Sequence, residues 1–193
     1  MVPGLPPKVA SDRLAQFKDM FADRNRKYEM YSLGERLFGL PVTEYPELLQ
    51  LQRDFKLLER LYGLYNDVIN TIAGYENIPW EKIDIEKMNQ EVTDFQTRQK
   101  KMPKQLREQE PFRQAFEDLT QVITDFGTTL PLLTELKKPY VLDRHWDRVS
   151  KACGVELDWK NPDFKVKNLL DANLARVKDE VEVLFTAAIY IYC

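Results

Sequence analysis

The side chains best suited to catalysis in this sequence are its one histidine, His145, and a nearby cysteine, Cys153. A cysteine–histidine pair performs nucleophilic catalysis when the imidazole removes the thiol proton. Because the two residues are eight positions apart, they would lie about two turns apart on one helix and would not touch. A single histidine without a Cys-x-x-Cys spacing also cannot anchor a zinc ion. We therefore expect no catalytic residue and no metal-binding residue.

Nucleotide and sugar chemistry are not indicated either. The phosphate-loop pattern Gly-x-x-x-x-Gly-Lys-Ser/Thr does not occur among the seven glycines, which are scattered along the chain. Acidic pairs such as Glu81 and Asp84 are typical of helix starts. A glycosidase needs two acids facing each other across a cleft, which striped helices do not offer. We expect no cofactor.

Basic residues cluster once, at Arg98, Lys100, Lys101, Lys104 and Arg107. Such a cluster is typical of a solvated helix face, and the alternative is a contact for an acidic protein partner. Nucleic acid is disfavoured because the cluster lacks interleaved aromatic residues and the chain is net acidic, with 28 basic and 31 acidic residues.

The composition is typical of long amphipathic helices. Charged residues make up 31% of the 193 positions and aromatic residues 11%, which disfavours disorder. Cys153 and Cys193 are too few for a disulfide scaffold, so we expect reduced cytosolic thiols. The N-terminal residues contain no apolar segment of a secretory signal, and we expect no membrane association.

Apolar residues recur at alternating spacings of three and four in at least five segments, and this rhythm predicts helices. The first helix is predicted from Ser11, as its cap, to about Leu33–Gly39, with a seam of Leu14, Phe17, Phe21, Tyr28 and Tyr31. Further helices are predicted over about 46–74, 84–103, 111–127, a short segment from Pro131, 144–153, and from Val166 onward with Leu170, Leu174, Val177, Val181 and Leu184 on one seam.

These elements predict an all-α fold, an elongated bundle in which the stripes pack on each other. Residues 1–8 are Pro-rich and are predicted to be a flexible lead-in. Residues 184–193 carry no charge and form an atypical apolar tail, which is an aggregation hazard unless it is covered.

The most informative segment lies between residues 130 and 146, and its distinctive positions are Leu130, Pro131, Leu136, Pro139, Arg144, His145 and Trp146. It resembles the dynein heavy chain linker: a Leu-Pro-Leu-Leu run, a Leu-x-x-Pro step, then Arg-His-Trp. The segments Leu37–Leu48, Trp80–Asp84 and Asn168–Leu174 are similar to axonemal outer-arm heavy chains, most like the gamma type. We interpret Trp146 as a packing anchor and His145 as its hydrogen-bonded or half-exposed neighbour; a pH or ligand switch at His145 is the alternative.

The resemblance implies that residues 9–183 are the N-terminal part of the linker, a helical rod that bends as an AAA+ ring hydrolyses ATP. It implies a non-catalytic mechanical role in ciliary movement, in the axoneme. It also implies as partners the rest of a heavy chain, the intermediate and light chains and, indirectly, the microtubule.

The tail departs from the family pattern, which continues as a charged and apolar helix. Ten residues are too few to span a bilayer, which needs about 20. Because the tail departs from the family pattern, we expect a truncated product, a splice form or a partial gene model. The alternative function is a free-standing helical adaptor, and a longer reading frame with six AAA+ modules would decide between the two.

Overall fold

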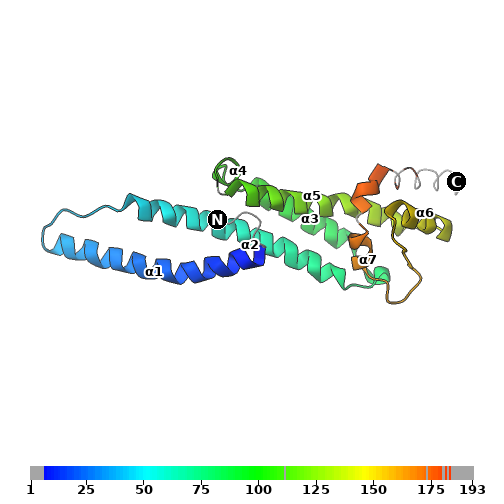
Figure 1. Ribbon diagram of the computed structural model, residues 1–193, viewed down its shortest axis with the longest axis horizontal. Coiled ribbons are helices and arrows are strands. Elements are labelled where there is room, and N and C mark those ends of the chain that lie inside the picture. The colour runs from blue at the N-terminus through cyan, green and yellow to red at the C-terminus, as the bar shows by residue number, and fades with distance from the viewer. Residues whose placement is uncertain (1–6, 111, 173, 180, 182, 184–193) are drawn as a thin grey trace. The chain divides into compact units, whose positions relative to one another are not determined.

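The computed structural model describes residues 7–110, 112–172, 174–179, 181 and 183. Residues 1–6 of the predicted lead-in over residues 1–8, and the predicted tail over residues 184–193 with Leu184, lie outside this part, whereas residues 7 and 8 are helical. The described residues are helical without a strand, which confirms the all-α prediction. The elements are α1 (Pro7–Leu37), α2 (Pro46–Glu76), η1 (Trp80–Lys82), α3 (Ile85–Lys100), α4 (Gln105–Glu108), α5 (Phe112–Leu136), α6 (Asp143–Cys153), α7 (Val166–Asp171) and η2 (Leu174–Val177) (Figure 1).

The chain forms two compact units. Unit 1 comprises the described residues of Met1–Asp67 and Met102–Glu117, and unit 2 those of Val68–Lys101 and Asp118–Cys193. Helices α2 and α5 therefore each supply residues to both units.

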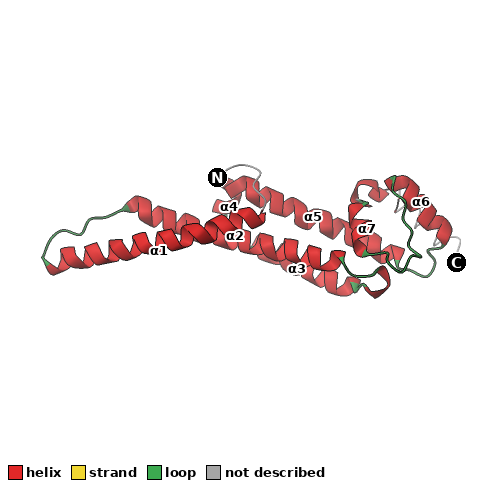
Figure 2. Ribbon diagram, turned by 60° about the horizontal axis from the view of Figure 1, so that its bottom comes forward, coloured by secondary structure: helices red, strands yellow, loops and turns green. Residues whose placement is uncertain are grey.

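In unit 1, α1 and the N-terminal part of α2 run antiparallel and are joined by the loop over residues 38–45 (Figures 1 and 2). Phe21 and Phe55 stack between them at 6.2 Å, and Lys18 Nζ lies 2.7 Å from Glu59 Oε1. Gly39 ends α1 with φ +64°, a left-handed conformation that glycine adopts without strain. Glu35 Oε2 then accepts a hydrogen bond from the Thr43 backbone N–H at 2.8 Å, which fixes the loop.

The predicted start and seam of α1 are wrong in part. The helix begins at Pro7, so Ser11 lies inside it and is not its cap. Phe17 and Tyr31, predicted on the buried seam, are 59% and 57% exposed. Within unit 1, α2 runs alongside α1 (Figures 1 and 2), and one helix covers only part of the circumference of another, so part of the stripe stays exposed.

Buried side chains of unit 1 concentrate on α2 and on the segment that contains α4. They include Leu61, Tyr62, Leu64, Met102, Leu106 and Phe112. The predicted stop near Pro103 is confirmed, because α3 ends at Lys100 and its C-cap is Lys101.

In unit 2, α3 lies alongside α5 (Figure 1). The two approach closely at Gly127, where a Cβ atom would lie 3.3 Å from Val92 Cγ1. Gln99, the polar residue on the α3 stripe, donates a hydrogen bond to Thr120 of α5. Asp84 caps α3 as predicted, accepting a hydrogen bond from the Lys87 N–H at 3.0 Å.

Helix α5 corrects one prediction. It continues through Pro131 to Leu136, whereas the sequence predicted an end near Gly127 and a separate short helix from Pro131. A proline inside a helix costs about 3 kcal/mol. Burial of Leu130, Leu132, Leu133 and Leu136, all at most 3% exposed, offsets that cost because each contributes about 1.5–3 kcal/mol.

The last predicted helix is interrupted. Helix α7 ends at Asp171, Ala172 lies in a turn, and η2 begins at Leu174. In an unbroken helix, Leu169 and Leu174 would point about 140° apart. The interruption lets both side chains enter the same core, where each is fully buried.

Candidate functional site

The residues singled out between 130 and 146 divide into buried and exposed groups in unit 2. Leu130, Leu136 and Trp146 belong to one core cluster and are 1%, 3% and 2% exposed. His145 is buried beside it at 3%. Pro131, Pro139 and Arg144 lie on the surface. The structure therefore brings together the apolar members of the segment and leaves its prolines and arginine outside the core.

Trp146 is at the centre of an aromatic cluster, which we define as Trp80, Trp146, Trp159 and Phe164. Its ring stacks on Trp159 at 5.5 Å and makes edge contacts with Trp80 at 5.8 Å and Phe164 at 6.2 Å. Such pairs are worth about 0.5–1.5 kcal/mol each beyond the area they bury. The cluster therefore joins η1, α6 and the segment before α7.

A short backbone pairing holds two of these partners in place. The Trp80 N–H donates to the Phe164 carbonyl at 3.0 Å, and the Val166 N–H donates to the Ile78 carbonyl at 3.1 Å. The pairing is the isolated antiparallel bridge Pro79–Lys165. Because both hydrogen bonds flank the aromatic residues, they fix Trp80 and Phe164 against Trp146.

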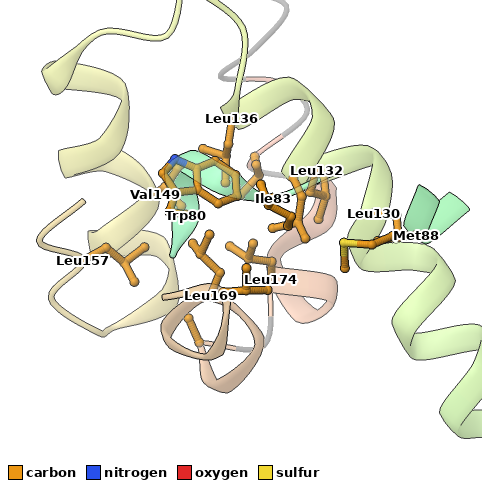
Figure 3. Close-up of a cluster of buried hydrophobic side chains, with 14 of the residues drawn as sticks. Trp80, Ile83, Met88, Leu130, Leu132, Leu136, Val149, Leu157, Leu169 and Leu174 are labelled. Atoms are coloured by element: carbon orange, nitrogen blue, oxygen red, sulfur yellow. The ribbon is translucent and has the colours of Figure 1, made fainter. Parts of the chain in front are cut away.

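The core beneath the cluster draws on several elements of unit 2. Figure 3 shows Trp80 of η1 among Leu136 of α5, Val149 of α6 and Leu169 of α7. Val149 and Leu169 are fully buried. The cluster thus closes a core that ties the C-terminal end of α5 to α6, α7 and η2.

The outer face of the cluster is closed by charged side chains. Lys160 lies over the Trp159 ring, with Nζ 5.4 Å from its centroid, and also pairs with Asp143 at the start of α6. Both charged groups are more than half exposed, so the pair contributes about 0–1 kcal/mol. Its effect is to position Trp159 over Trp146.

The first turn of α6 is closed by His145. Its Nδ1 accepts a hydrogen bond from the Leu142 N–H at 2.9 Å, so the neutral ring carries its proton on Nε2. The 3.4 Å approach of Arg144 Nε to that Nε2 is then a contact between two donors and not a hydrogen bond. Burial, followed by the charges of Arg144 and Arg148, lowers the pKa of His145.

Two further groups position the turn before α6. Lys137 Nζ donates to the Ile83 carbonyl at 2.6 Å, and Tyr140 donates to the Glu135 carboxylate. Burial, together with that carboxylate, raises the pKa of Tyr140 to about 12. These bonds tie the residues between α5 and α6 to the same core.

The aromatic cluster and its core hold helices together, and the described residues do not place the predicted candidates for catalysis, His145 and Cys153, in contact. His145 and Cys153 stand near opposite ends of α6, about 12 Å apart along its axis. No group of three or more His, Cys, Asp or Glu side chains in the described part of the chain could hold a metal ion. None of the described helices is long and apolar enough to cross a membrane.

Sequence reasoning found Trp146 but missed Trp159, Phe164 and the Pro79–Lys165 pairing. No periodicity connects these residues, because they stand in loops or next to them. The one available signal was scarcity: the chain has three tryptophans, and all three meet here.

A family model described as "Dynein heavy chain, N-terminal region 2" matches residues 48–190, which include the whole aromatic cluster. This chain belongs to the dynein heavy chain family. It is 41% identical over 189 residues to dynein axonemal heavy chain 5 of Rattus norvegicus and 43% identical over 189 residues to dynein axonemal heavy chain 8 of Homo sapiens. It is 44% identical over 193 residues to the dynein gamma chain of the flagellar outer arm of Chlamydomonas reinhardtii.

Each of these matches covers 98% of this chain, so α1, which precedes the family model's region, also has counterparts among axonemal heavy chains. The chain spans 4–5% of the length of these relatives. The aromatic cluster of this chain lies within the part that matches N-terminal region 2 of the family.

Proposed function

We propose that this chain is a non-catalytic mechanical element of an axonemal dynein heavy chain, the N-terminal part of the linker, with residues 9–183 as the linker segment. The observation that carries the proposal is the match of residues 48–190 to N-terminal region 2 of the family. The 44% identity to a flagellar outer-arm gamma chain supports the gamma type among the axonemal chains.

The packing of unit 2 supports a mechanical role. A lever transmits force if its elements keep their geometry under load, and a closely packed core resists deformation. The aromatic cluster and the Pro79–Lys165 pairing connect η1, α5, α6 and α7 through side chains that are almost all buried. Force applied at α6 is therefore carried to α5 and η1 through a core and not through a loop.

The proposed partners follow from the family. They are the remainder of a heavy chain and the intermediate and light chains, with the microtubule engaged indirectly, in the axoneme. ATP hydrolysis is assigned in this proposal to the AAA+ modules of the heavy chain and not to this segment.

One observation favours a second candidate, a free-standing helical adaptor. Unit 1 exposes several large apolar side chains, among them Phe17, Leu37 and Phe38 at 59%, 79% and 78%. Exposed apolar surface of this kind marks a protein interaction site. A transcript that continues in frame into six AAA+ modules supports the linker; a transcript that ends after Cys193 supports the adaptor.

A segment exchange tests the mechanical role directly. The matching segment of the Chlamydomonas gamma chain is replaced by this chain, and outer-arm assembly and flagellar beat frequency are measured. We expect the exchanged heavy chain to restore outer-arm assembly and beat frequency. The same exchange carrying Trp146→Ala should restore neither of them, and the free chain expressed alone should also restore neither. Restoration by the free chain would contradict the linker and favour the adaptor.

A further inference from the structure

Helices α1 and α2 of unit 1 enclose a long apolar groove of about 540 Å³. Eleven described residues line it; nine are Ala, Leu, Phe, Met or Tyr, and the other two are arginines. They are Ala10, Arg13, Leu14, Phe17, Met20, Phe21, Arg24, Leu51, Phe55, Leu58 and Tyr62. Phe17, Met20 and Leu51 are 59%, 54% and 50% exposed, so the walls of the groove carry apolar surface that faces water.

The spacing of the lining residues defines the shape that fits. On α1 they recur at intervals of three and four from Ala10 to Arg24, which is one continuous face about 21 Å long. A face of this length between two antiparallel helices is filled by a third helix that packs its ridges along the groove. Recognition of an amphipathic helix through residues at such spacings is a common mode of protein binding.

The charges define the chemistry of that helix. Arg13 and Arg24 are eleven residues apart, so they share one edge of α1 at a separation of about 16 Å. Among the described residues, no acidic side chain lines the groove and no ion pair joins either arginine to another side chain. The Lys18–Glu59 pair between the helices involves residues outside the lining.

A docked helix would take both arginines partly out of water. An unpaired charge at a closing interface is costly, whereas a carboxylate placed opposite it offsets the cost. We propose that the α1–α2 groove binds an amphipathic protein helix of at least three turns whose apolar face is bordered, on the edge facing α1, by carboxylates that pair with Arg13 and Arg24.

The test uses the full chain and two labelled peptides of about 21 residues, about six turns. Both peptides carry leucines on one helical face; one is bordered by glutamates and the other by lysines at the same positions. Fluorescence anisotropy measures binding. We expect saturable binding of the acidic peptide, at least about tenfold tighter than that of the basic peptide.

The variants separate the groove from general electrostatics. The double variant Arg13→Glu/Arg24→Glu should bind the acidic peptide at least about tenfold more weakly than the wild type and should bind the basic peptide more tightly. Arg53→Glu/Lys56→Glu makes the same change in net charge at exposed positions outside the groove and should leave binding unchanged. Because Arg24 also borders a smaller pocket with Glu44 and Glu47, Arg13→Glu alone should reproduce part of the loss.

Three results would overturn the proposal. The first is equal affinity for the two peptides, and the second is an equal effect of the two double variants on binding. The third is unchanged binding of the acidic peptide by Phe17→Glu, because this variant places a charge on an exposed wall of the groove. Sedimentation of the free chain tests whether a second copy of the chain fills the groove. If the chain self-associates, if Phe17→Glu abolishes that self-association, and if self-association blocks peptide binding, the groove would be assigned to a second copy instead.

Discussion

At the scale of single residues, Trp146 contacts three aromatic side chains, one from η1 and two from the segment between α6 and α7. Trp146→Ala should therefore lower the free energy of unfolding of unit 2 by about 3–5 kcal/mol, as for other buried aromatic truncations. Denaturant unfolding followed by far-ultraviolet circular dichroism measures the change. His145→Ala should cost about 1 kcal/mol, the value of one hydrogen bond.

A matched control for Trp146→Ala is Phe38→Ala, because Phe38 is an aromatic residue that is 78% exposed. Its effect should be within about 0.5 kcal/mol of zero, as for ordinary surface changes. If Trp146→Ala unfolded at the wild-type midpoint, the aromatic cluster would contribute nothing to stability in this chain.

His145 predicts a dependence of stability on pH. Its pKa is lowered in the folded chain, mainly by burial and then by Arg144 and Arg148, from an ordinary value of 6.5. The folded state thus favours the neutral ring. The contribution of the neutral ring to the free energy of unfolding is complete above pH 6.5. It is lost as the pH falls below that value toward the lowered pKa.

The comparison variant is His145→Asn, whose side-chain oxygen can accept the Leu142 N–H without titrating. Between about pH 7 and pH 5, the wild type should lose stability relative to this variant. Parallel stability curves for the two proteins over that range would show that the imidazole is not held in its neutral form.

At the scale of elements, two glycines of unit 1 predict opposite effects of one substitution. Gly63 lies exposed inside α2 with open space around it, so Gly63→Ala should stabilise the unit by about 0.5–1 kcal/mol through helix propensity. Gly39 also has open space but has φ +64°, so Gly39→Ala should destabilise by about 1 kcal/mol. Thermal unfolding of both variants checks the signs; two shifts in the same direction would contradict the end assigned to α1.

The helices of this chain could largely be predicted, and the exceptions have identifiable causes. Period and caps gave α2, α3 and α6 nearly to their ends, because Pro46, Asp84 and Gly154 act locally. The continuity of α5 through Pro131 could not be predicted, because it depends on tertiary burial of four leucines.

The site was less predictable than the helices. The burial of Trp146 could be anticipated from its residue type and its place on α6. Its partners Trp159 and Phe164 could not, because they are positioned by a backbone pairing between residues 86 positions apart, Pro79 and Lys165, that no local spacing encodes.

At the scale of the whole molecule, family membership and geometry support the same assignment from different directions. Residues 48–190 match N-terminal region 2 of dynein heavy chains, and the same span holds the core of unit 2. The exposed apolar residues concentrate instead in α1 and the first part of α2. Among the described residues, unit 2 therefore holds most of the buried apolar side chains and unit 1 most of the large exposed ones.

The last prediction concerns ATP. Gly34 and Gly39 have the glycine spacing of a phosphate loop, but Leu40 and Pro41 stand where lysine and serine or threonine are required. Gly34 also lies within α1, and the Glu35 carboxylate between the two glycines is kept ionised by hydrogen bonds from Thr43, which lower its pKa. A negative charge at that point repels phosphate, so the purified chain should neither bind nor hydrolyse ATP. A phosphate-release assay and a fluorescent nucleotide titration measure both; saturable turnover that survives repurification would contradict a purely mechanical role.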